Sequence, residues 1–575
     1  MNTKIILLIS AICFNCSLYG QISKAEYLYL KNKIPVEKIE IHTNTNLLVV
    51  GEFLHFQISN FNTGTKTYSS ISKITYVELI GDNHNVILKQ KLKSESGLSF
   101  GDFFLSSNIK TGHYKLIAYT NWSKNNDSNR FAEKDIYIIN PFSSKHQIPR
   151  KINSEAVISK ITTDHNDFSM NESINPILVS TNKKNYTTRE KVTINISENH
   201  LAAYNGLFSL SVRKFDSIFI KSDHKNEKKT ETSMKTYFLP ELRGDIISGR
   251  LTSLDNISVS DKLVSLSIPG KKFYFKNTRT NRRGDFHFIL NEHFNSSNAF
   301  IQVKEKNFKE YDIYLNEEGF NDYNDFKFNS VELNSNIKNW LTTRSINNQI
   351  ENVYLDSVIT NSNYDTNIKP FFNTLEKRFY LDDYNRFPTI KETIVEIVNT
   401  ASLSQKNGRY EFNIPDYGNI YFNNNLNLKP LVLFDGFYIE NLNDIIDFNT
   451  NKLESISTVT GLYVYGTEIY NGVISFLSKQ GDFKLNSVQD DIQILNLSNL
   501  KTYQSPNYNS KIDKRIPDYR TQLFWKPNVN LNNSNNEPYY FEFFTSDEFG
   551  VFEVILEGYT NTGKHIKMAT YFNVN

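Results

Sequence analysis

The residues with the most recognisable catalytic spacing are Gly97-Leu98-Ser99-Phe100-Gly101, which match the Gly-x-Ser-x-Gly pattern of many hydrolases. In such enzymes a strand, a sharp turn and a helix expose the serine hydroxyl as a nucleophile. Here the runs on both sides alternate apolar and polar residues, which is typical of strands. We therefore expect Ser99 to lie in a β-connection, and an undetected hydrolase stays open as an alternative.

A second set of polar residues has the spacing of a metal loop. Asp447, Asn449 and Asn451 alternate as at the start of a calcium-binding loop, but the glycine and the distal glutamate of that loop are missing. Asn451 and Glu454 are spaced nearly as in a capping box. We therefore interpret this segment as the start of a helix over residues 451–456 and predict no metal site.

Asp382 and Asp383 are adjacent carboxylates, so on a strand they would point to opposite faces and could not act as a pair. We expect them to be solvated or to cap a helix over residues 389–400, after Pro388. The chain has no HExxH pair, no phosphate-binding loop and no dinucleotide-binding glycine pattern. The sequence therefore predicts a protein that is not an enzyme, with no catalytic, cofactor-binding or metal-binding residues and no cofactor.

The N-terminal residues 1–20 have the features of a secretory signal peptide: Lys4, then a short apolar run, then small residues before Gln21. The two cysteines, Cys13 and Cys16, both lie inside this segment and do not follow the small residue that a lipid-anchor signal requires. We expect cleavage near Gln21, with a lipid anchor as the alternative. The mature chain would then contain no thiol, and so no disulfide.

Composition and periodicity define the broad class of the chain. The 575 residues carry a net charge of +2, which gives no electrostatic reason to expect a nucleic-acid partner. After the signal segment no apolar run is long enough to form a transmembrane helix. β-Branched and aromatic residues alternate with polar ones at short spacing almost throughout. The pattern predicts a mostly β protein, with tandem β-sandwich domains plus one small α+β unit.

Residues 34–140 resemble the macroglobulin-type β-sandwich of the alpha-macroglobulins. The matching motifs are Ile41-His42-Thr43, Gly51-Glu52, Val77-Glu78-Leu79, Gly112-His113-Tyr114 and Ala118-Tyr119-Thr120-Asn121-Trp122. The opening pattern recurs more weakly in residues 170–235, which we expect to form a second sandwich. The resemblance does not extend to covalent protease trapping, because the Cys-Gly-Glu-Gln thioester of that family needs a cysteine.

The middle of the chain resembles another exported domain. Residues 243–316 resemble the carboxypeptidase regulatory-like β-sandwich at Gly249-Arg250-Leu251 and at Gly284-Asp285-Phe286-His287-Phe288. That domain carries no catalytic residues, so no peptidase activity is implied. Apolar residues at helical spacing then predict a helical connector over residues 340–366, with its helix near 345–361.

Residues 371–483 resemble the plug domain of TonB-dependent outer-membrane receptors. The matches, in the order of that family, are Asp435-Gly436, Glu454-Ser455-Ile456, Tyr465-Gly466, Asn471-Gly472-Val473-Ile474, Lys479 and Gly481. We expect the glycine pairs at turns and a buried core formed by Val432, Leu433, Ile456, Val459, Val473 and Ile474. Fewer than a hundred residues follow Phe483, too few for a receptor barrel, so we expect no channel.

A last β domain is expected over residues 518–575. Its pattern is defined by Arg520, Trp525, Pro527, Thr545-Ser546-Asp547, Gly550 and Glu557-Gly558. At these residues it resembles the closing domain of Bacteroidetes-type exported proteins that combine macroglobulin and plug-like domains. The combined resemblances imply an exported, non-enzymatic binding or scaffold protein in the periplasm or at the outer membrane. Its expected partners are envelope proteins, including a TonB-linked importer. A noncovalent, macroglobulin-like defence protein that contacts proteases remains the second alternative.

Overall fold

The structure is a computed structural model. It describes residues 35–126, 130–142, 155–160, 177–198, 205–216, 218–222, 238–253, 257–290, 298–304, 310–316, 319, 323–353, 359–362, 370–372, 374–415, 428–484, 491–493, 497–498, 500–503, 505–508, 516–532 and 538–575. Strands make up 53% and helices 10% of the described structure, which confirms the predicted mostly β class. The expected signal peptide and both cysteines lie outside the described residues. Within the described part, no helix has the length and apolar character to cross a membrane.

The first sandwich is built from nine strands in two facing sheets. One sheet contains β1 (Glu37–Thr43), β3 (Phe53–Asn62), β4 (Thr67–Tyr68) and β7 (Leu98–Phe104). The other follows the order β2 (Leu47–Val49), β9 (Ala132–Ile139), β8 (Gly112–Tyr119), β5 (Ile74–Ile80) and β6 (Val86–Lys93). Their inward residues form one core, which Phe326 and Phe328 complete from a distant part of the chain.

The second sandwich differs from expectation, because residues 170–235 and 518–575 do not form separate units. One sheet has the order β11 (Ile177–Thr181), β13 (Lys191–Glu198) and β34 (Tyr539–Phe544). The other has the order β12 (Asn185–Tyr186), β36 (His565–Val574), β35 (Gly550–Thr560), β14 (Gly206–Lys214) and β33 (Gln522–Leu531). Each half alone would leave strand edges open and an apolar face exposed, so the two halves pair and share one core.

The third sandwich has the sheet orders β19-β16-β21 and β18-β17-β20-β31. Its strands are β16 (Asp245–Ser253), β17 (Leu263–Ile268), β18 (Tyr274–Arg279), β19 (Asp285–Leu290), β20 (Asn298–Val303), β21 (Tyr311–Leu315) and β31 (Asp491–Gln493). The chain returns from the plug-like unit to add β31 beside β20.

A small third sheet and one long helix join the sandwiches. The sheet contains β10 (Glu155–Lys160), β15 (Ile218–Ser222) and β22 (Ser330–Leu333). Helix α3 (Lys338–Val353) begins earlier than the expected connector and also ends earlier. Residues expected at the end of that helix instead form β23 (Ile359–Ser362), because β32 (Leu500–Tyr503) pairs with them antiparallel.

The unit over residues 371–483, which we call the plug-like unit after its sequence resemblance, contains in its described residues a five-stranded mixed sheet and one short α-helix, α4 (Ile390–Glu396). The sheet order is β24 (Lys377–Tyr380), β29 (Leu453–Tyr465), β30 (Glu468–Ser478), β27 (Leu431–Phe434) and β28 (Phe437–Tyr438). A separate hairpin contains β25 (Ser402–Lys406) and β26 (Arg409–Asn413). The six residues predicted to form the core are all buried: Val432, Leu433, Ile456, Val459, Val473 and Ile474.

The expected helix over residues 451–456 is wrong. A single 3₁₀ turn, Thr450–Lys452, is capped by Asn449, and β29 starts at once at Leu453. The capping signal was real, but Ser455 and Ile456 pair with both β24 and β30. This pairing on two sides outweighs a local helix preference of a few tenths of a kcal/mol per residue.

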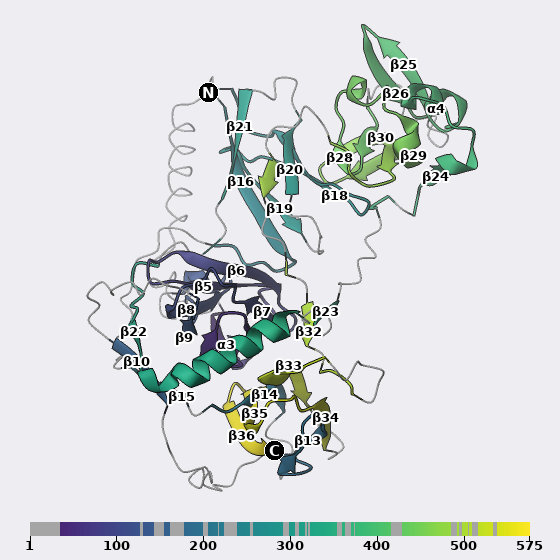
Figure 1. The fold of residues 1–575 in the computed structure, drawn as a ribbon. Coiled ribbons are helices and arrows are strands. Elements are labelled where there is room, and N and C mark those ends of the chain that lie inside the picture. Colours follow the sequence, from purple (N-terminus) through teal and green to yellow (C-terminus); the bar gives the residue numbers. More distant parts are fainter. Residues whose placement is uncertain are drawn as a thin grey trace, which may run out of the picture.

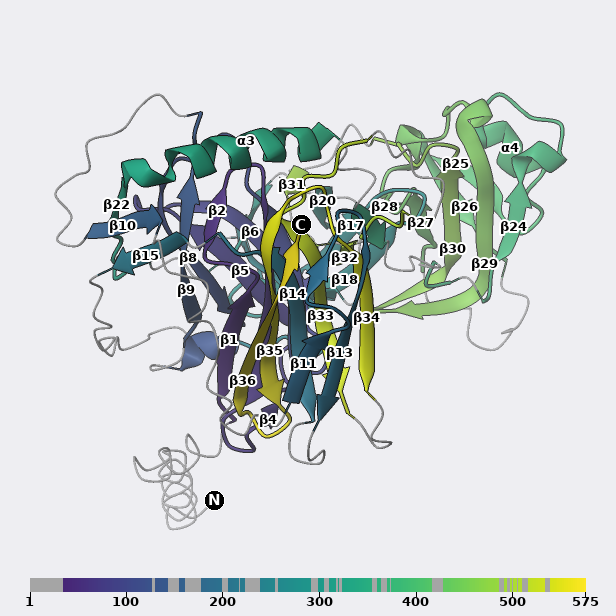
Figure 2. The same ribbon diagram turned by 60° about the horizontal axis from the view of Figure 1, so that its bottom comes forward.

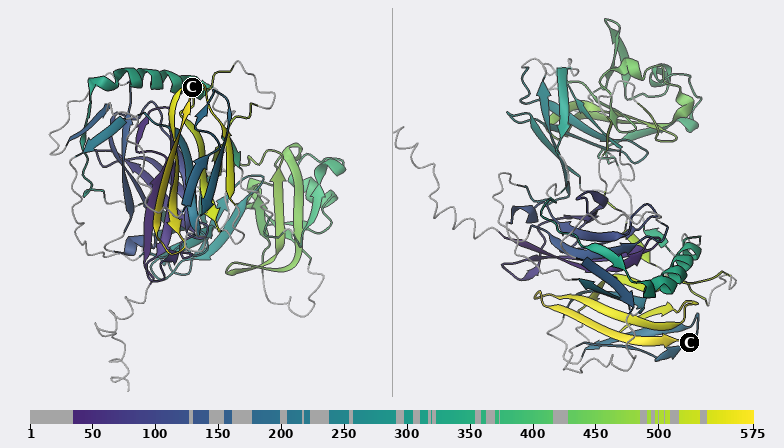
Figure 3. Two further views of the ribbon diagram at one scale, coloured as in Figure 1. Left: turned by 90° about the horizontal axis from the view of Figure 1, so that it is seen from below. Right: turned by 60° about the vertical axis from the view of Figure 1, so that its left-hand side comes forward.

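The units are stacked along one direction. The first sandwich lies between the second, near the C-terminus, and the third, and the plug-like unit sits beside the third (Figure 1, and Figure 3, right). Helix α3 runs across one end of the first sandwich (Figure 2). In chain order, the third sandwich and the plug-like unit both lie between the two halves of the second sandwich. Strand β23 precedes the plug-like unit and pairs with β32, which follows that unit and β31.

Candidate functional site

Ser99 lies inside β7 and not on an exposed elbow. It is buried, and its hydroxyl donates to Thr75 Oγ1 at 2.9 Å. The following residues continue the strand to Phe104, so no helix follows the serine. The geometry that would make this serine a nucleophile is therefore not formed.

The adjacent carboxylates Asp382 and Asp383 both lie in the 3₁₀ turn Leu381–Asp383. Within this turn, the Asp382 carboxylate pairs with Arg386 and, at 3.7 Å, with Lys479. The cap of helix α4 is Thr389, whose hydroxyl accepts from the Glu392 amide in a complete capping box. Asp382 and Asp383 therefore do not cap that helix, because Thr389 occupies the N-cap position.

A serine, a histidine and a carboxylate that sequence spacing did not reveal meet between the first and second sandwiches. The Ser209 hydroxyl contacts His42 Nδ1, and His42 Nε2 lies 3.0 Å from Glu557 Oε2. The three residues come from β14, β1 and β35, and Ser209 is 167 residues from His42. The three residue types, and the order in which they contact one another, are those of the catalytic serine, histidine and acid of a hydrolase.

Burial argues against catalysis at this cluster. Ser209 is 0% exposed and His42 is 5% exposed. Ser209 is a mid-strand residue of β14, which is paired on one side with β35 and on the other with β33. A substrate could not reach the hydroxyl, and the strand's backbone amides are engaged in the sheets rather than available as an oxyanion hole.

The protonation states of His42 and Glu557 favour a structural role for the cluster that they form with Ser209, as a link between the two sandwiches. Burial lowers the pKa of His42. Burial also opposes ionisation of Glu557, but hydrogen bonds with His42 and His565 and the charge of Lys567 outweigh it and hold the Glu557 pKa far below its ordinary value. A neutral His42 can accept from Ser209 and donate to an ionised Glu557. This chain of hydrogen bonds fixes the first sandwich to the second.

A second buried polar cluster joins the first and third sandwiches. Lys91 Nζ donates to Asp245 Oδ2 at 2.8 Å, and Tyr76 Oη donates to Glu241 Oε1 at 2.9 Å. Burial, and next the charge of Asp245, raise the pKa of Glu241 to about 8. Glu241 is therefore a neutral acid at pH 7, and the single lysine offsets one carboxylate rather than two.

Glu241→Gln is expected to stabilise the protein at pH 8 and to change little at pH 4.5. The folded state keeps the Glu241 proton up to a pKa of about 8, whereas an unfolded chain loses it near the ordinary value of 4.5. The stability of the wild-type protein therefore falls as pH rises between these values. The glutamine side chain of the variant does not titrate, so the variant does not lose this stability. The gain at pH 8 should reach a few kcal/mol at most. Thermal unfolding at both pH values measures it; an equal effect at both would contradict the raised pKa.

The plug-like unit is fixed to the third sandwich by a shared apolar core. Phe273 and Phe275 from the third sandwich pack with residues of the plug-like sheet, including Leu433 and Val473. Asn277 Nδ2 donates to Tyr470 Oη at 3.0 Å, and Arg279 pairs with Glu468 at 2.6 Å. These contacts make the two units one body rather than two tethered domains.

The predicted Asp435-Gly436 turn is confirmed, and it is part of this interface. Both residues have positive φ, 47° and 90°, in a two-residue turn between β27 and β28. The buried Asp435 carboxylate accepts from Ser478 N at 2.7 Å, Ser478 Oγ at 2.6 Å and Phe483 N at 3.1 Å. Burial raises the pKa of Asp435. The aspartate thus ties the turn to the chain that leaves the unit.

The hairpin between β29 and β30 has two unlike faces. Its inner face holds Tyr465, which stacks on Phe371 at 3.9 Å between ring centroids, and the buried Tyr470. Its outer face, defined by Leu462, Val464 and Ile469, is 38%, 70% and 51% exposed. Val464 and Ile469 are direct cross-strand partners, so the apolar groups are contiguous.

The edge of this hairpin is also open among the described strands. β24 pairs with β29 only from Ser455 to Thr458, so the rest of β29 has a single described neighbour, β30. An apolar face beside an unpaired strand edge is a recognised surface for protein association. The outer hairpin face is therefore the candidate binding surface of the plug-like unit.

No protein-family model matches the chain, and no curated protein matches it. Among solved structures it is similar to Escherichia coli alpha-2-macroglobulin activated by porcine elastase, at 9% identity over 94% of this chain and 44% of that chain, with a TM-score of 0.24. It is also similar to Salmonella alpha-2-macroglobulin reacted with methylamine, at 8% identity over 94% of this chain and 39% of that chain, with a TM-score of 0.23.

A further similar structure is the CARDB domain of the PF1109 protein from Pyrococcus furiosus, at 14% identity over 18% of this chain and 94% of that chain, with a TM-score of 0.14. The chain spans less than half the length of the two macroglobulins. These TM-scores are too low to define a shared overall architecture, so the β-sandwich class rests on the strands described above.

Proposed function

We propose that this chain is an exported, non-enzymatic binding protein of the cell envelope, and that its plug-like unit docks on a protein partner. The observation that carries the proposal is the outer hairpin face, where Leu462, Val464 and Ile469 are exposed side by side on two paired strands. Contiguous exposed apolar groups of this kind mark interaction sites more often than chance.

The packing of the hairpin against the rest of the molecule also supports a role in binding a protein partner. Its inner face is held by Phe371 and by the third sandwich, so the outer face keeps one orientation without a partner. A preorganised surface loses little conformational entropy on binding. The resemblance to receptor plugs suggests that the partner belongs to a TonB-linked outer-membrane import system.

The proposal is tested by capture from solubilised envelope membranes with the immobilised full chain. Importer components should bind wild-type protein and be reduced at least about tenfold by the double change Val464→Lys and Ile469→Glu, since interface anchors dominate affinity. The two opposite charges face each other across the strands and preserve their pairing.

The matched control is Val395→Lys, which adds a charge at an apolar residue of the same unit that is 66% exposed on helix α4. Its capture should equal that of wild type. Equal capture by the hairpin variant would overturn the proposal. Recovery of proteases in place of importer components would favour the defence alternative.

A further inference from the structure

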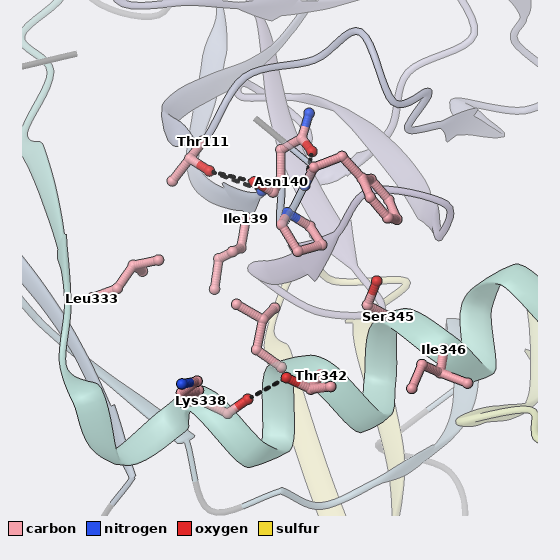
Figure 4. Close-up of a pocket in the computed structure, with 11 residues that line it drawn as sticks. Thr111, Ile139, Asn140, Leu333, Lys338, Thr342, Ser345 and Ile346 are labelled. Atoms are coloured by element: carbon pink, nitrogen blue, oxygen red, sulfur yellow. Dashed lines mark hydrogen bonds between the residues drawn. The ribbon is translucent and has the colours of Figure 1, made fainter. Parts of the chain in front are cut away.

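A pocket of about 390 Å³ lies where the first sandwich meets helix α3, on a different unit from the hairpin. The end of β9 and the chain after it form one wall, and the first two turns of α3 form the other (Figure 4). Its size is within the range of about 300–1,000 Å³ that is usual for ligand sites.

The middle of the pocket is apolar. Ile139, Leu333 and Leu341 line it, and Ile139 is completely buried. Phe142 and Ile346, which are 54% and 51% exposed, also line it. An apolar side chain placed here would remove apolar surface of both walls from water, which favours binding.

Two polar groups lie at opposite ends of this apolar stretch. Lys338 and Ser345 are separated by seven residues of α3, which places them on the same side of the helix about 10 Å apart along its axis. Figure 4 shows Lys338 at one end of the pocket and Ser345 at the other. No acidic side chain is among the described residues that line it.

Neither polar group has a partner among the described residues. Ser345 is 6% exposed, and no hydrogen bond to its hydroxyl is formed within the described structure; the hydroxyl is not among the fully enclosed unpartnered atoms, so it faces the pocket and not the packed interior. Lys338 forms no ion pair with any carboxylate in the same described ranges. By contrast, Thr111 and Asn140 bond to each other, and Thr342 donates to the Lys338 carbonyl at 3.0 Å. The lysine and the serine are therefore the two groups that a ligand could satisfy.

We propose that this pocket binds the C-terminal end of an extended peptide. The terminal carboxylate would pair with Lys338, an apolar last side chain would lie between Ile139 and Leu341, and a backbone group further back would bond to Ser345. Extended chain advances about 3.3 Å per residue, so three residues span the distance between the two polar groups. Capture of a terminal carboxylate is an established mode of peptide recognition.

The buried serine favours a peptide over a simple acyl carboxylate. Both ligands offer an anion to Lys338 and apolar groups to Leu341. Only the peptide carries a polar backbone atom about 10 Å from its carboxylate. An acyl chain in the same position would enclose the Ser345 hydroxyl without a hydrogen bond, which is unfavourable.

The test is calorimetric titration of the full mature chain with acetyl-Ala-Ala-Leu, acetyl-Ala-Ala-Phe and acetyl-Ala-Ala-Val as free acids. At least one free acid should bind saturably, and its carboxamide should bind about threefold to fivefold more weakly, the range for a solvent-exposed ion pair. Lys338→Gln should abolish the difference between acid and amide. Ser345→Ala should weaken both forms about fivefold, as expected for one lost hydrogen bond.

Lys110→Gln is the matched control, because it removes an exposed positive charge beside Thr111 without changing a lining residue. Its titrations should equal those of wild type. The absence of saturable binding for all three acids would overturn the proposal, as would equal binding of acid and amide. Tighter binding of decanoate than of any peptide would overturn it in favour of an acyl ligand.

Discussion

Ile474→Asp is expected to unfold the plug-like unit and to leave the first two sandwiches folded. Ile474 is completely buried on β30, where it pairs with Val432 and Thr458. The change loses roughly 1.5–3 kcal/mol of apolar burial and places an unpaired charge in the core at a further cost of several kcal/mol. Limited proteolysis with mass spectrometry should show rapid cleavage within residues 371–483 while fragments of the first sandwich persist.

Val464→Asp provides the control for this experiment. It makes the same kind of change in the same sheet, but at a residue that is 70% exposed. Its cleavage rate should match that of wild type. If Ile474→Asp were equally resistant, β30 would be exposed in solution and the resemblance to receptor plugs would be a coincidence of turns.

Gly436→Val is expected to have the second large effect, on the attachment of the plug-like unit. A Cβ atom on Gly436 would lie 2.3 Å from Phe273 Cβ of the third sandwich, and the residue has φ of +90°. Valine therefore adds backbone strain of about 1–2 kcal/mol and a steric clash across the interface. We expect a loss of more than about 3 kcal/mol in the free energy of unfolding, measured by denaturant titration.

Gly408→Val separates the two causes. Gly408 also has a positive φ, +77°, but nothing lies within 4 Å of its Cβ position. Gly408→Val should therefore lose only the free energy that corresponds to backbone strain. The difference in the free energy of unfolding between the two variants then measures the contribution of the steric clash at the interface. Equal losses in the two variants would mean that the units do not touch at Gly436 in solution.

Local sequence patterns predicted the class and much of the plug-like unit. Alternation and turn glycines identify strands directly, which is why Val432 and Ile474 were correctly placed in a core. The helix at residues 451–456 failed because sheet pairing from β24 and β30 acts over distance and overrides a local capping signal. Helix α3 starts before its apolar periodicity does, because the preceding Asn334 caps the 3₁₀ turn that leads into it.

The sites were harder to predict from the sequence than the fold, because most of their residues lie far apart in the chain. Ser209 and Glu557 are 348 residues apart, and no local motif brings them to His42. The carboxylates Glu241 and Asp245 are close in sequence, but the lysine that faces Asp245 is 154 residues away. Lys338 and Ser345 are the exception, since their spacing of seven places both on one helix face and could have been noticed.

The divided second sandwich has a consequence for the order in which the chain can mature. Asn185 meets Asn573 across a separation of 388 residues. During synthesis, β11 and β13 can pair with each other early, but β12, β14 and the second edge of β13 find their partners only when β33 to β36 have been made. Until then the early half presents apolar faces and open edges, a state prone to aggregation. We therefore expect the third sandwich and the plug-like unit, which lie between the two halves in the chain, to fold before the second sandwich is complete, while the early half needs protection from aggregation.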